Sequence, residues 1–479
     1  MQPHQERRSR GAKIYPNGTR LRRPWLPALL PLACLACLAH TATAAEWSVP
    51  ADLRARVDAL TDAQRAFIES GDVLEIIPER QLKHELGTRD SEDLARFVGD
   101  LMALADEMAY DPTRDMGAAP LNLKSKRFNA PTPTPAPLRS LDRKPGPFSV
   151  HRYLYPTSGV PTFAGAKVAI YAEDLIAGNV DVAIIGVPSN ASSGRRDAGH
   201  GPDEMRALDT IGTPDIQSLV DPLDALSVVD YGNFYEDWQS TERTVEHVAG
   251  MVAETVATGA IPMLVGGDTS MLYPGVRGVA EAREGTRFGL LHFSAHPDAE
   301  RYGDHTISDR QALFALLDQD IVAGRDVVEV GLRGPDVDAD TLQWLRDRGV
   351  RYHTMAEMRQ RGADRVLQRV LKEVRKGPDA FFVSIDVSVI TPAEMIAAGR
   401  LTPEGLDIDA VTGAIRHVCA SKDIVGFEIT DMAPMLDLSR LSVLNANALL
   451  NACLVGIAVR RSGLDPDYVH PLALDHGQR

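Results

Sequence analysis

Between about residues 150 and 465, apolar runs of strand length alternate with amphipathic stretches of helix length. The runs are almost continuously apolar, which is typical of strands buried on both faces. Because strands that alternate with helices form a parallel sheet covered on each side, the pattern predicts a three-layer α/β domain with a mostly parallel central sheet. The predicted strands are Val182–Ile185, Ser227–Val229, Pro262–Val265, Phe288–Phe293, Val327–Val330, Phe381–Ile385 and Val425–Ile429. The predicted helices are Thr241–Thr258, Asp309–Asp318, Thr341–Arg348, Ala363–Arg375, Asp407–Ala420 and Arg440–Arg460.

The part of the chain before this α/β domain, which we assign to residues 151–479, divides into three segments. Residues 1–45 have a basic start, an apolar stretch and a small-residue cleavage site, and are predicted to be a signal peptide. Residues 46–110 carry apolar residues at three- and four-residue spacing and are predicted to form a helical extension. Residues 111–150 are rich in proline and are predicted to be an extended linker. The extension carries no recognisable chemistry, so an oligomer arm and a loosely attached cap are both open.

Export is the expected consequence of the signal peptide. The mature protein is predicted to be soluble and periplasmic or secreted, and the sequence leaves both the Sec and the twin-arginine route open. No later run is long enough to cross a bilayer. The net charge of −15 becomes −21 when the seven basic residues and one acidic residue of positions 1–45 are removed. This charge argues against nucleic acid or an anionic membrane as a partner.

Four cysteines are too few for a disulfide framework. Cys34 and Cys37 lie in the signal peptide, which leaves Cys419 and Cys453. Two distant cysteines in predicted helices are expected to be buried free thiols. An oxidising compartment would also allow them to pair.

Chemically active residues gather in three segments that directly follow predicted strands. The ligands of parallel sheets bind beyond the carboxyl ends of the strands, so the three segments are expected to form one site. The segments are Gly266-Gly267-Asp268-Thr269-Ser270, His292-Phe293-Ser294-Ala295-His296-Pro297-Asp298 and Ser384-Ile385-Asp386-Val387-Ser388.

In order and spacing these segments resemble the metal-binding signatures of the ureohydrolase family, which contains arginase, agmatinase and their relatives. The likeness extends over roughly residues 180–455 and includes an early Gly-x-Pro at Gly186, a Gly-x-Arg that ends at Arg333, and the late segment Gly426–Pro434. It implies the αβα fold of that family and a site in which two manganese ions share a bridging water that attacks a guanidinium carbon and releases urea. It also implies a guanidino or amidino small molecule as ligand and assembly as a trimer or hexamer.

Three metal-ligand positions of the family pattern carry a hydroxyl residue in this chain. Thr269 stands in place of a His, and Ser294 and Ser388 each stand in place of an Asp. Two dications a few ångströms apart repel strongly, and the two remaining carboxylates offset only one of them. The normal binuclear cluster is therefore not expected. Reading the three hydroxyls as a nucleophile set is disfavoured because the sequence shows no base oriented toward them.

The positions that the resemblance retains as metal ligands are His296, Asp298 and Asp386. They are the candidate ligands of a single divalent ion, manganese by resemblance, with zinc or nickel as alternatives. Neighbouring acidic residues such as Glu300 and Glu394 would complete such a set. The structural alternative is a buried hydrogen-bonded His–Asp pair, with Asp386 accepting N–H groups of its own loop.

The substrate end also departs from the family pattern. Asp431 occupies the position of a Glu that accepts hydrogen bonds from the guanidinium, and it is one methylene shorter. Asp431 remains the candidate substrate-binding residue, with a structural cap or salt bridge as the alternative. His305 corresponds to a family histidine that shuttles protons and is the candidate catalytic residue; a solvated loop histidine is the alternative.

Together, the resemblance and the departures predict an exported ureohydrolase-fold protein with an incomplete metal site, catalytically silent or weakened. It would act as a partner subunit in an oligomer or bind a guanidino compound without turning it over. Two alternatives stay open. One is an active, agmatinase-like and urea-releasing hydrolase of linear amidines or guanidines that uses one metal ion. The other is a purely structural partner whose N-terminal helices make the interaction.

Overall fold

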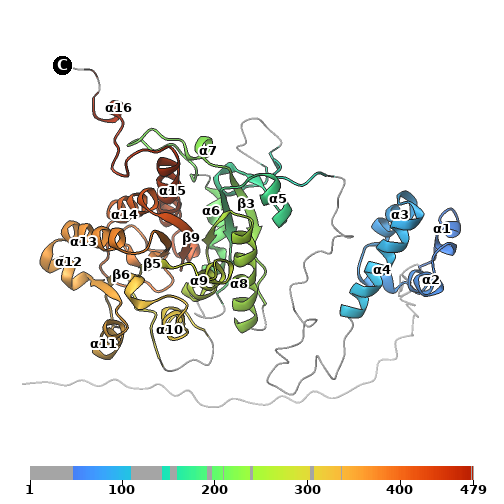
Figure 1. Ribbon diagram of the computed structural model, residues 1–479, viewed down its shortest axis with the longest axis horizontal. Coiled ribbons are helices and arrows are strands. Elements are labelled where there is room, and N and C mark those ends of the chain that lie inside the picture. Colours follow the sequence, from blue (N-terminus) through green and yellow to red (C-terminus); the bar gives the residue numbers. More distant parts are fainter. Residues whose placement is uncertain are drawn as a thin grey trace, which may run out of the picture.

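The computed structural model describes residues 47–108, 143–151, 159–190, 197–208, 210–237, 241–301, 307–335, 337–475 and 477. The predicted signal peptide and most of the predicted linker lie outside these residues. Figure 1 shows a sheet with helices on both sides, and the separate helices α1 to α4 of the N-terminal segment.

The centre of the domain is a single parallel sheet. Within the described residues it has nine strands in the order β1-β3-β2-β4-β9-β8-β5-β6-β7, and each neighbouring pair is parallel. The strands are β1 (Lys167–Val168), β2 (Val182–Gly186), β3 (Val228–Asn233), β4 (Ile261–Val265), β5 (Phe288–Phe293), β6 (Val327–Leu332), β7 (Arg351–Thr354), β8 (Ala380–Asp386) and β9 (Asp423–Thr430). The four strands β4, β9, β8 and β5 are neighbours in the middle of the sheet, so the loops at their carboxyl ends meet.

Helices cover both faces because the side chains of each strand alternate between two apolar clusters. In β2, Val182 and Ile184 join one cluster, whereas Ala183 and Ile185 join the other. The first cluster is completed by α6 (Gly201–Ala207), α12 (Met355–Arg361), α13 (Ala363–Lys376), α14 (Ile408–Ser421) and α15 (Leu441–Arg461). The second is completed by α5 (Ala172–Ala177), α8 (Thr241–Ala257), α9 (Leu272–Ala282), α10 (Ala312–Asp318) and α11 (Ala339–Asp347). The short helices α7 (Pro222–Ala225) and α16 (Pro471–Leu474) are single turns.

The predicted three-layer fold with a mostly parallel sheet is confirmed. Each of the seven predicted strands is present, with ends that differ by no more than a few residues. The sequence missed β1, which has two residues, and β7, which carries the polar residues Arg351 and His353 at the edge of the sheet. It also missed α9, which begins two residues after the first motif and contains Pro274 and two glycines.

The N-terminal segment folds into helices that share an apolar core of their own. These are α1 (Arg54–Asp58), α2 (Asp62–Glu69), α3 (Glu79–Thr88) and α4 (Ser91–Met108). Leu82, Leu86, Phe97 and Val98 are buried in that core. Thr61 caps α2 through a capping box with Gln64, which fixes the start of that helix.

Residues 143–148, at the end of the predicted linker, are tied to the α/β domain. Arg143 donates two hydrogen bonds of 2.7 Å to the carboxylate of Asp174, and the Gly146 N–H donates a third of 2.8 Å. Phe148 pairs with Val168 in an antiparallel bridge. Burial alone would raise the pKa of Asp174, but the bond from Arg143 and the backbone N–H groups hold it well below its usual value.

The Asp174 carboxylate is expected to make the stability of the domain depend on pH at the acid end. Because its pKa is lower in the folded state, its contribution is complete above the unfolded pKa of about 4 and is lost as the pH falls further. Urea unfolding from pH 7 to pH 2 should show Asp174→Asn to be less stable than the native chain, with a difference that shrinks below about pH 4. Asp423→Asn, at a half-exposed position that pairs with Arg283 at 3.6 Å, is the control. A difference that is constant over the whole range would contradict this role.

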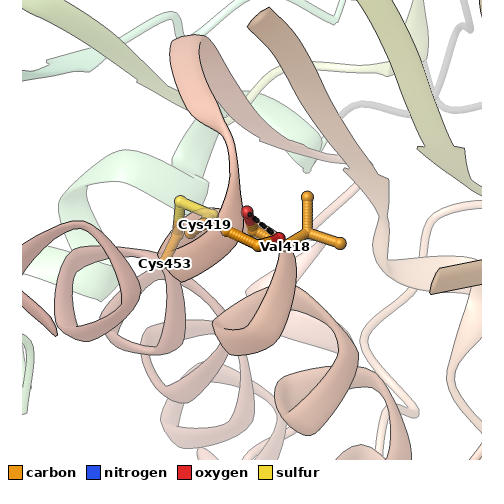
Figure 2. Close-up of a disulfide and its surroundings, with 4 residues drawn as sticks. Val418, Cys419 and Cys453 are labelled. Carbon is orange, nitrogen blue, oxygen red and sulfur yellow. Dashed lines mark hydrogen bonds between the residues drawn. A yellow bond between two sulfur atoms is a disulfide. The ribbon is translucent and has the colours of Figure 1, made fainter. Parts of the chain in front are cut away.

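Cys419 of α14 and Cys453 of α15 form a disulfide, with their Cα atoms 5.2 Å apart (Figure 2). The expectation of buried free thiols was therefore wrong, although both residues are buried. The reason is tertiary: α14 and α15 pack along each other on one face of the sheet, which brings together two positions 34 residues apart. The alternative that the sequence left open, pairing of the two cysteines, is the one that the structure adopts.

Contrary to the expectation from the sequence, one described helix, α15, is long and apolar enough to cross a membrane, but 72% of its most apolar stretch is buried inside the domain. Its side chains Leu449, Leu450, Cys453 and Leu454 belong to the apolar cluster under the sheet. We interpret α15 as a core helix.

Candidate functional site

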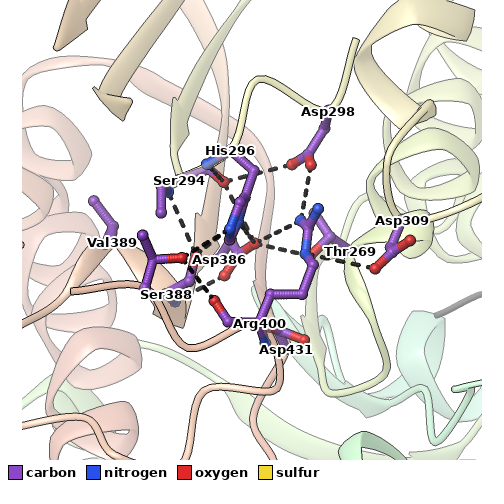
Figure 3. A network of polar contacts seen from close by, with 12 residues as sticks. Thr269, Ser294, His296, Asp298, Asp309, Asp386, Ser388, Val389, Arg400 and Asp431 are labelled. Atoms are coloured by element: carbon purple, nitrogen blue, oxygen red, sulfur yellow. Dashed lines mark hydrogen bonds and ion pairs between the residues drawn. The ribbon is translucent and has the colours of Figure 1, made fainter. Parts of the chain in front are cut away.

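The three motif segments and Asp431 converge at the carboxyl ends of β4, β5, β8 and β9, as the sequence predicted (Figure 3). Asp386 is the last residue of β8 and accepts the Ser388 N–H at 2.8 Å, which starts a short 3₁₀ turn. Asp268 does the same after β4 with the Ser270 N–H at 3.1 Å. The side chains of the site are almost completely buried.

The centre of the site is occupied by a side chain that the sequence had not indicated, the guanidinium of Arg400. Its Nη2 donates to Asp298 Oδ1 at 2.8 Å and to Asp386 Oδ2 at 3.0 Å. Its Nε lies 3.5 Å from Asp309 Oδ2. Figure 3 shows the guanidinium lying between these carboxylates. Only 6% of the Arg400 side chain is exposed, so one buried cation is shared by two buried carboxylates, one on the loop after β5 and one at the end of β8.

The loop that carries Arg400 is held by backbone contacts on both sides. The Arg400 N–H donates to Asp431 Oδ2 at 2.7 Å, and the Gly399 N–H donates to the Asp431 carbonyl at 2.9 Å. A Cβ at Gly399 would lie 2.4 Å from Asp431 Oδ1, so only glycine allows this approach. Arg333 donates to the carbonyls of Pro403 at 2.9 Å and Ser388 at 2.5 Å, which fastens the far end of the loop.

Asp431, the predicted substrate-binding residue, therefore caps a backbone N–H group of the loop that carries Arg400. Its backbone is left-handed with φ +65°, a conformation that costs energy in a non-glycine residue. Burial and the nearby Asp386 carboxylate raise the pKa of Asp431 well above its ordinary value. Asp298 also has a left-handed backbone, with φ +46°. A strained backbone conformation of this kind persists only where the contacts of the surrounding structure hold the residue in place.

The hydroxyl residues at the three altered positions all face the remaining candidate ligands Asp298, Asp386 and His296. Thr269 Oγ1 donates to Asp386 Oδ2 at 3.0 Å. Ser294 Oγ lies 3.4 Å from Asp386 Oδ2 and 3.5 Å from Asp298 Oδ2. Ser388 Oγ is 3.4 Å from His296 Nδ1. Neutral donors thus surround the carboxylates where the family pattern has further anionic or imidazole ligands.

His296 has hydrogen-bond partners on both of its ring nitrogens. Nε2 lies 3.0 Å from the Thr402 hydroxyl, and Nδ1 lies 3.4 Å from Ser388 Oγ and 3.9 Å from Asp386 Oδ2. Burial alone would raise the pKa of Asp386, but the His296 imidazole and the Arg400 guanidinium hold it far below its usual value. Asp386 is therefore an anion at neutral pH.

A second polar row lies in the sheet directly below the site, with one residue from each of four adjacent strands. The residues are Glu428 of β9, Ser384 of β8, His292 of β5 and Glu329 of β6, which pair in register. Ser384 donates to Glu428 Oε1 at 2.6 Å and lies 3.0 Å from His292 Nδ1, and His292 Nε2 lies 3.3 Å from Asp298 Oδ2. Burial raises the pKa of Glu428 to about 8 and that of Glu329 well above its usual range. The row contacts the Asp298 carboxylate through His292.

Hard divalent cations need several carboxylate oxygens, and a pair of them needs more anionic charge than one. At the six metal-ligand positions of the family pattern stand two carboxylates, one imidazole and three hydroxyls, with the Arg400 guanidinium bonded to both carboxylates. Among the described residues, no group of three or more His, Cys, Asp or Glu side chains is arranged to hold a metal ion. This donor set does not fit a pair of manganese ions.

The structure brings four of the five predicted site residues together: His296, Asp298, Asp386 and Asp431 (Figure 3). His305 lies outside the described residues. Sequence reasoning missed Arg400, Asp309 and Thr402. A charge argument would have indicated that buried carboxylates without metals need another cation, but no motif distinguishes Arg400 from the other arginines of the chain.

The arginase family model matches residues 180–456, more than half of the chain, so the chain belongs to the arginase family. It is 27% identical over 307 residues to a guanidinopropionase from Pseudomonas aeruginosa, covering 62% of this chain and 90% of that one. It is 28% identical over 320 residues to the mitochondrial agmatinase of Gallus gallus, covering 66% of this chain and 90% of that one. The predicted family membership is confirmed.

Solved structures support the same fold. Proclavaminate amidino hydrolase from Streptomyces clavuligerus superimposes with a TM-score of 0.58 at 22% identity, covering 63% of this chain and 98% of that one. A Trypanosoma cruzi formiminoglutamase determined with manganese superimposes with a TM-score of 0.53 at 22% identity, covering 59% of this chain and 95% of that one. At this identity the likeness shows the fold alone.

Proposed function

We propose that this chain is a non-hydrolytic member of the arginase family, which holds no manganese pair, releases no urea and acts as a partner subunit. The observation that carries the proposal is the convergence of Thr269, Ser294 and Ser388 on the site as neutral hydroxyls. A hydroxyl adds no negative charge, so two carboxylates would face four positive charges of a metal pair. Without a metal-bound water, the site has no nucleophile for a guanidinium carbon.

The partner role is supported by exposed apolar side chains on the segment that leads into α15. Met435 is 69% exposed, Leu436 56% and Leu438 93%, and Leu441 and Leu444 continue the series into the helix. Exposed apolar groups that gather in this way are typical of association surfaces. The assembly that fits this proposal is an oligomer of the chain with itself or with a competent relative. The predicted signal peptide and the Cys419–Cys453 disulfide both support an exported protein that folds in an oxidising compartment.

The competing function is a hydrolase of linear amidines or guanidines that uses a single metal ion. It is favoured by one observation, namely that Asp298 and Asp386 both bond to Arg400 Nη2 while His296 Nδ1 lies 3.9 Å from Asp386 Oδ2. An ion at that point would have to displace the Arg400 guanidinium from both carboxylates, and for this reason we place this function second.

Residues 46–479 are expected to bind manganese well below one ion per chain and to release no urea. The purified protein is incubated with excess Mn²⁺, freed of unbound metal, analysed for manganese, zinc and nickel, and assayed for urea with agmatine, guanidinopropionate and guanidinobutyrate. The guanidinopropionase of Pseudomonas aeruginosa, treated in the same way, is the positive control. Two manganese ions per chain, or urea release that Asp386→Asn abolishes, would end the proposal. Light scattering of the same sample tests the association, and a monomer at micromolar concentration would contradict self-assembly.

A further inference from the structure

The Arg400 guanidinium lies between the carboxylates of Asp298, on the loop after β5, and Asp386, at the end of β8, and its Nη2 bonds to both of them. We propose, in an inference that rests on the proposed function, that Arg400 is the permanent cation of the pocket. The site is then a guanidinium-binding site that is filled by the guanidinium of Arg400. Arg400 supplies the positive charge that holds Asp298 and Asp386 in place. The pocket therefore needs no metal ion to be stable, and its two central carboxylates are already bonded to a guanidinium.

The charges around Arg400 support this assignment. Asp298 and Asp386 are both fully buried, and two buried carboxylates facing each other without a cation would be strongly destabilising. Asp309 lies on a third side, 3.5 Å from Arg400 Nε. Within the described residues, the other buried arginine near the site is Arg333, whose bonds go to backbone carbonyls. The charge balance at the centre of the pocket thus depends on Arg400.

The shape of the guanidinium matters as well as its charge. A planar guanidinium offers several N–H donors in fixed directions, which suits carboxylates that approach from different sides. A lysine ammonium would bring a point charge on a flexible stem and would reach fewer of them. The carboxylates that surround Arg400 would therefore also accept a free guanidinium ion, provided that the side chain were removed.

The attachment of the loop indicates that Arg400 is a permanent part of the site rather than a plug that swings out. Asp431 binds the backbone on both sides of the Gly399–Arg400 peptide, and Arg333 fixes residue 403. Thr402 completes the anchor through the 3.0 Å contact with His296. Free guanidino compounds are consequently expected not to bind to the native chain at this site.

Removing the side chain provides the test. Arg400→Ala leaves a cavity lined by Asp298, Asp386 and Asp309, and guanidinium chloride at low millimolar concentration should raise its melting temperature by several degrees, since a ligand that binds only the folded state stabilises it. Sodium chloride at equal ionic strength is the salt control. The native chain and Arg359→Ala, which removes a largely exposed arginine paired with Glu404, should show no such increase. Absence of a guanidinium-specific increase in Arg400→Ala, or an equal increase in the native chain, would overturn the assignment.

A second pair of variants keeps the proposal testable if Arg400→Ala does not fold. Arg400→Lys retains the charge, and Arg400→Met retains similar length without it. The expected order of melting temperatures is native, then Lys, then Met, and a Met variant as stable as the Lys variant would overturn the role of the charge. These outcomes are distinct from those of the proposed function. Manganese binding and urea release by the native chain test that function, whereas guanidinium rescue and the Lys–Met order test Arg400.

Discussion

Arg400→Met is expected to lower the free energy of unfolding by about 3–5 kcal/mol, the range found when one partner of a buried ion pair is removed. The reason is that Asp298 and Asp386 would remain buried without their counter-ion, and no other described cation reaches both of them. Equilibrium unfolding in urea is the measurement, because guanidinium would itself bind the vacated site. A loss of this size is a large share of the total stability of a typical domain.

The matched control is Arg359→Met, which removes an arginine whose side chain is 59% exposed and pairs with Glu404 on the surface. Its expected cost is about 1 kcal/mol or less. Adding Asp386→Asn to Arg400→Met should restore part of the lost stability, because one uncompensated charge disappears. Equal effects of Arg400→Met and Arg359→Met, or a double variant no more stable than Arg400→Met alone, would show that Arg400 does not balance the carboxylates.

Loss of the Cys419–Cys453 disulfide is the second large expected effect. A bridge that closes a loop of 34 residues constrains the unfolded chain by about 4 kcal/mol in the loop-entropy description. Replacing both cysteines by alanine should therefore lower the free energy of unfolding by about 2–4 kcal/mol. Urea unfolding of the double variant is compared with that of the native protein with and without a reductant.

Reduction breaks the disulfide but leaves both side chains in place, so it distinguishes the stabilising effect of the bridge from that of side-chain packing. If the disulfide carries the effect, the reduced native protein and the double alanine variant should unfold at similar urea concentrations. Thiol titration of the unfolded, unreduced protein should find no free cysteine in the mature chain. Two titratable thiols in protein produced in an oxidising compartment, or an unchanged unfolding midpoint after reduction, would contradict the structural role of the bridge.

The sequence predicted the architecture well because burial on both faces leaves a direct signature in the chain. Strands such as Phe288–Phe293 and Phe381–Ile385 are apolar at nearly every position, and in the structure they form the centre of the sheet. The edge strand β7 carries Arg351 and His353 and lacks that signature. Its place in the sheet depends on its pairing with β6, which is a tertiary interaction.

The candidate site was predictable where residues follow a strand directly and not where they arrive on a loop. His296, Asp298 and Asp386 were found because the motif segments resemble the metal-binding signatures of the family, and their place after β5 and β8 predicted that they meet. Arg400 reaches the same point only because Asp431 and Arg333 fold the loop after Ile390 back over the site. The cysteine pair was missed for a similar reason, since its proximity depends on how α14 packs against α15.

A protein cation, the Arg400 guanidinium, occupies the place where relatives are expected to hold metal. The most direct measurement is a crystal structure of residues 46–479 grown with millimolar Mn²⁺, with anomalous diffraction collected at the manganese edge. The expected result is electron density for the Arg400 guanidinium between Asp298 and Asp386, without an anomalous peak at that point. Two strong anomalous peaks there, with Arg400 displaced from both carboxylates, would contradict it.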